Sequence, residues 1–97
     1  MTNDVVVRVY LSEFREKVFR ALPPAPYQIS LHKLTIKVYG GYDAKNDKGR
    51  RSHVMKALYD LWKMKLAYHE AIRRGGRWTG TKYSRTSKRV IIERKPR

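Results

Sequence analysis

Four polar side chains recur at helical spacing in the middle of the chain: Ser52, Lys56, Tyr59 and Lys63. At 100° per residue these positions share one face of a helix. Lysine donates hydrogen bonds to guanine acceptors and serine to several bases, so such a face has the chemistry to contact base edges in a groove. Asp60 lies beside this face and is its nearest carboxylate in sequence.

Two further groups of cationic residues flank this segment. The first stands where the helix is expected to begin, and comprises Arg50, Arg51, Ser52 and His53. Backbone amides at a helix start, together with Arg and Ser side chains, suit phosphate contacts. The second group surrounds glycine turn signals, and comprises Arg73, Arg74, Arg77, Lys82, Arg85, Lys88 and Arg89. A basic hairpin can follow a phosphate backbone, and an Arg at its tip can enter a narrow minor groove.

Trp78 lies among these cationic residues, in a segment that is otherwise polar. An exposed ring there would stack on a sugar or a base. Packing of the ring back against the sheet is the alternative that the sequence leaves open.

The charge of the chain is unevenly placed. Lys and Arg number 23 and Asp and Glu number 8, for a net charge of +15 over 97 residues. Residues 1–44 contribute +2 and residues 45–97 contribute +13. A one-sided excess of this size predicts an anionic partner, with nucleic acid ahead of an anionic membrane surface or an acidic protein.

The sequence gives little indication of metal binding, catalysis or membrane insertion. Cysteine is absent, which excludes disulfides and thiolate-ligated metals, and the three histidines lack the spacing of metal ligands. The carboxylates are scattered, and no nucleophile-elbow or phosphate-loop motif occurs, so we expect no enzyme, metal or cofactor. No apolar run exceeds three residues and none follows Met1, so we expect neither a membrane span nor a signal peptide, and a cytoplasmic location.

The first half of the chain predicts an extended segment and two helices. Alternating β-branched residues predict a strand or extended arm over 5–11, with an early start of the first helix as the alternative. Ser12 is a candidate N-cap for an amphipathic helix that the prolines after Leu22 end. Ser30 is a second candidate N-cap, for a helix that ends at Gly40–Gly41. Apolar and polar residues also alternate over 34–39, as in a strand, but we favour the helix.

The second half predicts a loop, a longer helix and a hairpin. Polar turn formers predict a loop over Gly41–Arg51. A helix is expected from Ser52 to Met64, with a core-facing stripe of Val54, Leu58, Leu61 and Trp62. Residues 67–73 predict a strand, residues 77–88 a long basic hairpin tip, and Arg89–Arg94 a returning strand.

This order of elements resembles the winged helix-turn-helix family of DNA-binding domains over residues 12–94. The resemblance is carried by Ile29–Ser30 before the second helix, by Val54, Ala57, Leu58 and Leu61 in the third, by Leu66 and Tyr68 leading into the hairpin, by Gly75–Gly76 and Gly80 within it, and by Val90 and Ile92 in the return strand. One departure is the connection between the second and third predicted helices, about ten residues where the family uses a few.

The resemblance implies an α+β fold of three helices with a C-terminal β-hairpin wing, preceded by an N-terminal arm over 1–11 and followed by a basic tail over 95–97. It also implies sequence-selective binding of double-stranded DNA, as in small regulators and partition proteins of archaeal plasmids and viruses, with association with the nucleoid. We expect a homodimer, because one recognition helix reads few base pairs, and the apolar arm over 5–11 together with the first helix is its expected contact. RNA binding, as by a ribosome-associated protein, and non-specific coating of nucleic acid are the alternatives.

Overall fold

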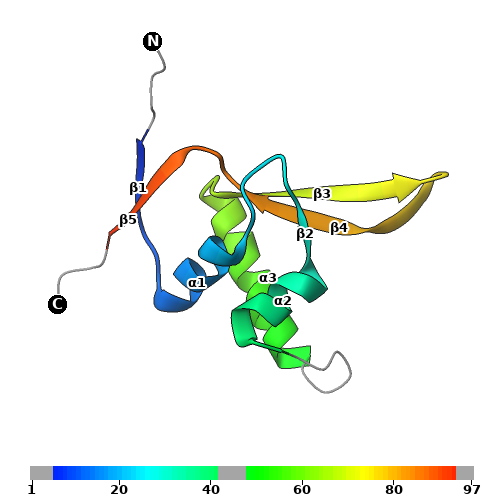
Figure 1. Cartoon of the computed structure of the whole chain (residues 1–97), viewed down its shortest axis with the longest axis horizontal. Coiled ribbons are helices and arrows are strands. Elements are labelled where there is room, and N and C mark those ends of the chain that lie inside the picture. The colour runs from blue at the N-terminus through cyan, green and yellow to red at the C-terminus, as the bar shows by residue number, and fades with distance from the viewer. Residues whose placement is uncertain (1–5, 42–47, 94–97) are drawn as a thin grey trace, which may run out of the picture.

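The computed structural model describes residues 6–41 and 48–93, except for the side chains of Trp78 and Thr79. Over these residues the chain is an α+β fold of three helices and two small sheets (Figure 1). In chain order the elements are β1 (Val6–Tyr10), α1 (Glu13–Ala21), β2 (Ile29–Ser30), α2 (Leu31–Tyr39), α3 (Lys48–Lys63), β3 (Ala67–Arg74), β4 (Arg77–Arg85) and β5 (Arg89–Glu93). The β3–β4 hairpin projects from the helices on one side, and β1 and β5 lie on the opposite side.

Both predicted serine caps are confirmed. The Ser12 hydroxyl accepts a hydrogen bond from the Arg15 amide at 3.3 Å, and the Ser30 hydroxyl accepts one from the Lys33 amide at 3.2 Å. Each bond satisfies an amide that has no partner within its own helix. Residues 34–39 are therefore helical, and Gly40 ends α2 in the left-handed conformation, with φ of 75°.

The core lies where the three helices meet. Val54, Ala57, Leu58 and Leu61 of α3 are all buried, as predicted, and pack in one cluster with side chains of α1 and α2. The prediction that Trp62 completes this stripe is wrong, because its side chain is 46% exposed. Leu61 points into the centre of the core, and the next residue of a helix points about 100° away from it, so Trp62 lies at the edge of the core beside β3.

The third helix is longer than predicted. It begins at Lys48, so the assignment of residues 48–51 to a loop is wrong. Lys and Arg are good helix formers, and the segment has no proline, so α3 extends N-terminally through Gly49 at modest cost. The helix ends at Lys63, one residue before the predicted end, and Lys65 follows with φ of 61°.

The basic segment 77–88 is largely a strand and not a long loop. Gly75 and Gly76, with φ of 59° and 80°, form a tight turn, because both positions require the conformation that glycine tolerates. β4 then pairs antiparallel with β3 along its length and with β2 at Ile29 and Ser30, in the strand order β2-β4-β3. Threonine and tyrosine at alternate positions favour this strand more than the surrounding charge opposes it.

The return strand forms as predicted but pairs elsewhere. β5 lies parallel to β1 in a separate two-stranded sheet, so its assignment to the wing is wrong. Val7 and Val9 stand opposite Val90 and Ile92, and all four pack against the helical core. Burial of this shared apolar face explains the pairing. Residues 6–10 of the predicted arm therefore belong to a sheet, while residues 1–5 of that arm and the predicted tail over 95–97 lie outside the described residues.

Candidate nucleic-acid interface

The four residues predicted to share one face of the third helix are exposed on α3. We call Ser52, Lys56, Tyr59 and Lys63 the α3 polar face. Tyr59 is 53% exposed, and the Lys63 ammonium lies 4.6 Å from the centre of its ring. This cation–π contact holds the two side chains together, while the Lys63 ammonium remains accessible to an anion.

The cationic group at the start of the helix lies within the first turns of α3, and not ahead of them. Arg50, Arg51, Ser52 and His53 are all exposed. The Arg50 guanidinium lies 5.2 Å from the Tyr39 ring centre and donates to the Gly41 carbonyl at 3.5 Å, and the His53 ring meets Phe14 edge-on at 6.4 Å. Arg50 therefore contacts α2 and His53 contacts α1, while Arg51 and Ser52 face solvent.

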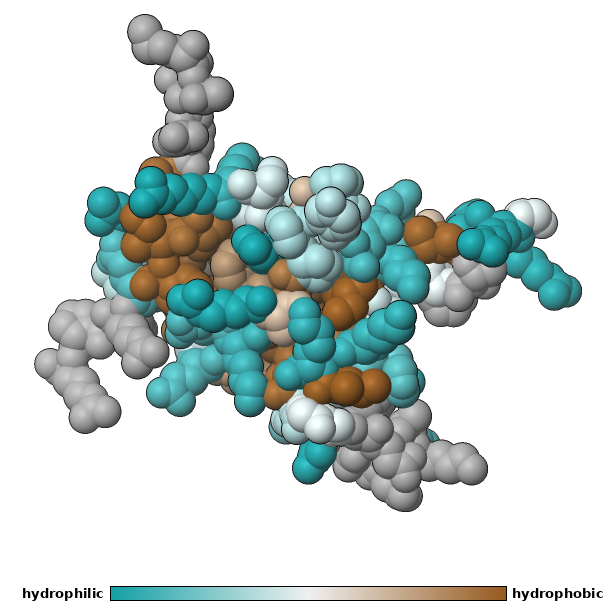
Figure 2. All heavy atoms as spheres, viewed as in Figure 1, coloured by the Kyte–Doolittle hydropathy of each residue, from teal (hydrophilic) through white to brown (hydrophobic). Residues whose placement is uncertain are grey.

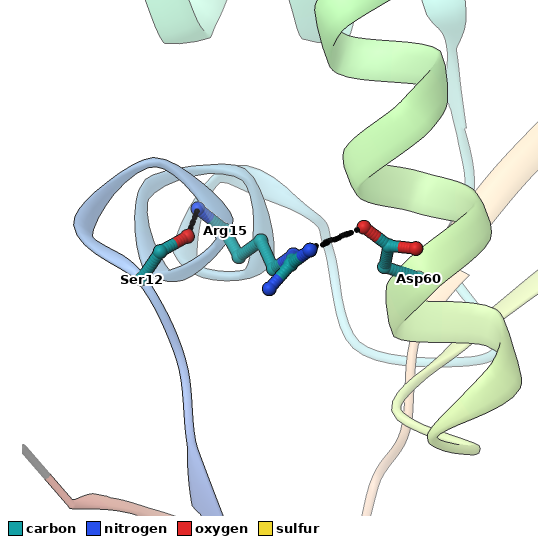
Figure 3. A network of polar contacts seen from close by, with 3 residues as sticks. All are labelled: Ser12, Arg15 and Asp60. Atoms are coloured by element: carbon teal, nitrogen blue, oxygen red, sulfur yellow. Dashed lines mark hydrogen bonds and ion pairs between the residues drawn. The ribbon is translucent and has the colours of Figure 1, made fainter. Parts of the chain in front are cut away.

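The carboxylate beside the α3 polar face is engaged within the fold. Asp60 accepts hydrogen bonds from Arg15 of α1 at 2.6 Å and 3.1 Å, and Ser12 caps the same turn of α1 (Figure 3). The Asp60 side chain is only 25% exposed. Because Asp60 is the sole acid of α3 and points toward α1, the charge presented by the α3 polar face is positive.

Three arginines gather at the turn of the β3–β4 hairpin, and we call Arg73, Arg74 and Arg77 the arginine tip. All three are exposed, and Arg74 stands directly opposite Arg77 across the strands. Within the part of the chain that the structure describes, none of them forms an ion pair. Like charges in direct cross-strand register destabilise a hairpin unless an anion neutralises them. Figure 2 shows this projecting hairpin as largely hydrophilic.

The remaining predicted residues divide along the hairpin. Lys82 is half-buried midway along β4, and Lys88 is exposed beyond its end. Arg85 is at the base of the hairpin, where its Nε donates to the Leu22 carbonyl at 3.0 Å and its guanidinium lies 5.8 Å from the Phe19 ring centre. At about 3.3 Å per residue, Arg85 is some 26 Å from Arg77, so it secures the hairpin to α1 and does not join the arginine tip.

The backbone of Trp78 belongs to β4 and pairs with Arg73. Its side chain lies outside the described part of the structure, so stacking by its ring stays a prediction.

An aromatic surface that was not predicted from the sequence lies next to the α3 polar face. Trp62 and Tyr68 are 46% and 43% exposed, and the Trp62 ring lies 5.9 Å from Tyr59 and 5.4 Å from His69, centre to centre. The spacing of Tyr59 and Trp62 was an available signal, because residues three apart on a helix are neighbours. Burial raises the pKa of the nearby Tyr83 phenol above its ordinary value.

The described residues contain no group of three or more His, Asp or Glu side chains placed to hold a metal ion. No helix within residues 6–41 and 48–93 is long and apolar enough to cross a membrane. Comparison of the chain with protein-family models, with curated proteins and with solved structures finds no match.

Proposed function

We propose that the protein binds double-stranded DNA sequence-selectively, as a transcriptional regulator or a partition protein. The observation that supports this proposal most strongly is that one small domain presents two exposed cationic surfaces, the α3 polar face and the arginine tip of the β3–β4 hairpin. The order α1, β2, α2, α3, β3, β4, with β2 joined to β4, is the arrangement expected of a winged helix-turn-helix domain and supports that assignment.

In this proposal α3 enters the major groove. A B-form major groove admits one α-helix, and Lys56 and Lys63 can donate to guanine O6 and N7. The Arg51 and Ser52 side chains then reach the phosphates at the groove edge. Because Arg15 neutralises Asp60, the approach of α3 to the polyanion meets no uncompensated carboxylate on this helix.

The β3–β4 hairpin acts as the wing in this proposal. The arginine tip contacts the backbone or a narrow minor groove beside the major-groove site. Each neutralised phosphate releases counterions, which gives most of the affinity and makes it dependent on salt. The repulsion between Arg74 and Arg77 in the free protein is relieved when phosphates lie between them.

A direct comparison of nucleic acids tests this function against the RNA-binding alternative. We expect the protein to bind a mixed-sequence DNA duplex more tightly than a structured RNA of equal charge at the same salt, because a side chain on a helix reaches base edges only in a B-form major groove. Fluorescence anisotropy with labelled DNA and RNA measures both affinities. Tighter binding of the RNA would replace the proposal with the RNA-binding alternative.

We also propose that two copies associate through the β1–β5 sheet. Apolar surface gathers over these strands, on the side of the molecule opposite the hairpin (Figure 2). Among the described residues β1 pairs with β5 alone, so its second edge is open, and Val6 and Tyr10 are 38% and 54% exposed. A two-stranded sheet is marginal by itself, and pairing of β1 with its copy about a two-fold axis would give four strands.

Sedimentation at micromolar concentration tests this dimer. We expect twice the chain mass of 11.5 kDa for the native sequence, and the single mass for a Val6→Lys, Tyr10→Lys variant, because lysine at an open edge opposes strand addition. Arg8→Lys, on the same strand, is the matched control and should stay dimeric. A monomeric native chain, or a dimer that persists in the double variant, would remove the sheet from the interface.

A further inference from the structure

An open cleft of about 380 Å³ lies between the second half of α3 and the β3–β4 hairpin. Tyr59 and Trp62 of α3 line one side, Tyr68 and His69 of β3 and Tyr83 of β4 the other. A volume of this order suits a small planar ligand, and clefts lined by aromatic rings with a few polar groups are typical binding sites. The cleft adjoins the α3 polar face because Tyr59 belongs to both.

The rings of this cleft are exposed to a degree that the fold does not require. Trp62 is 46% and Tyr68 43% exposed, and Met55, also on the cleft, is 48% exposed. Contiguous apolar surface of this kind on a small domain marks an interaction site. The tilted contacts of Trp62 with Tyr59 and His69 fix its orientation and so reduce the entropy lost when a ligand stacks on it.

The charge around the cleft selects an anionic occupant. The Lys63 ammonium lies over the Tyr59 ring, and Lys56 precedes Tyr59 by three residues on the same exposed face of α3. The nearest carboxylates by sequence are directed elsewhere: Asp60 pairs with Arg15, and Glu70 accepts a hydrogen bond from Gln28 at 2.7 Å. A flat ring joined to a phosphate therefore satisfies both the aromatic lining and the cationic rim.

We propose that this cleft receives an unpaired nucleobase of the bound DNA, stacked on Trp62. Hydroxyl groups of Thr81 and Tyr83 and the imidazole of His69 lie in the lining and can hydrogen-bond the base edge. This inference rests on the proposed function, since contacts of α3 and the hairpin with phosphates bring the strand to the cleft. Every base can stack on an aromatic ring, so the cleft does not select a base sequence. It adds a preference for DNA that contains an unpaired base, and α3 supplies the preference for sequence.

Three duplexes of one sequence test the proposal: a perfect duplex, one with a single unpaired adenine, and one with an abasic site at the unpaired position. We expect the native protein to bind the adenine bulge about 10-fold more tightly than the abasic bulge, since stacking on an aromatic side chain favours binding by roughly this factor. Trp62→Leu should abolish that ratio and change affinity for the perfect duplex less than about two-fold. Trp62→Phe should restore part of the ratio.

Tyr27→Leu is the matched control, because Tyr27 is 71% exposed and does not line the cleft. In a Trp78→Phe background Trp62 is the single tryptophan, so its fluorescence should be quenched by the adenine bulge and not by the abasic bulge. Equal affinity for the two bulges, or a ratio that survives Trp62→Leu, would overturn the inference. Failure to bind the perfect duplex would instead contradict the proposed function, so the two failures are distinguishable.

Discussion

Replacing all three residues of the arginine tip with glutamine is expected to weaken binding to every duplex on the order of 100-fold at about 0.1 M salt. Arg73, Arg74 and Arg77 are exposed at the far end of the hairpin, where glutamine removes charge without disturbing a buried contact. Each lost phosphate contact lowers the slope of log affinity against log salt by about 0.9, so the slope should fall by about 2.7. Binding titrations at several salt concentrations measure both quantities.

The matched control removes the same charge elsewhere. Lys17, Arg20 and Lys33 are exposed on α1 and α2, outside the arginine tip, and their replacement with glutamine should leave the salt slope nearly unchanged. If both triple variants lose affinity equally, net charge and not the wing attracts the DNA. An unchanged slope in the tip variant would exclude the hairpin from the interface.

Lys56→Ala is expected to lower the ratio of specific to non-specific affinity about 10-fold, because a well-placed lysine at a base edge discriminates by about 1–3 kcal/mol. Lys56 is exposed at the centre of the α3 polar face, between the turns that hold Ser52 and Tyr59. Alanine is the best helix former, so the change should not disturb α3. Competition between the preferred duplex and a mixed-sequence duplex measures the ratio.

Lys17→Ala on α1 removes the same side chain from an exposed helix position and should leave the ratio unaltered. Tyr59→Phe keeps the ring against Trp62 and beneath Lys63, so any fall in the ratio reports the lost hydroxyl. Equal losses of specific and non-specific affinity in Lys56→Ala would show that α3 contacts only the backbone.

Local rules were sufficient to predict the two serine caps and the exposed face of α3. Ser12 and Ser30 are caps because a serine before an apolar period satisfies an amide within three residues, and that geometry does not depend on tertiary context. The spacing that buries Val54 and Leu61 places Lys56 on the opposite face of α3. Periodicity alone was therefore enough to predict the α3 polar face.

Features that depend on long-range packing were not predictable in this way. The parallel pairing of β1 with β5 joins the two ends of the chain, and no local pattern distinguishes this pairing from a hairpin return. The exposure of Trp62 depends on how α3 packs against β3. The hydrogen bond from Arg85 to the Leu22 carbonyl depends on the position of that carbonyl in the folded chain. A cationic composition likewise did not reveal that Arg85 and Arg77 belong to opposite ends of one hairpin.

Sequence-selective binding of double-stranded DNA can be measured by selecting bound duplexes from a random-sequence pool, with structured RNA as competitor. We expect enrichment of a short motif repeated as an inverted pair, because in the proposed dimer each α3 reads a few base pairs and a two-fold axis relates the two copies. The RNA competitor should not remove the enriched duplexes. Recovery of duplexes without a shared motif, or their displacement by the RNA, would contradict sequence-selective binding of double-stranded DNA.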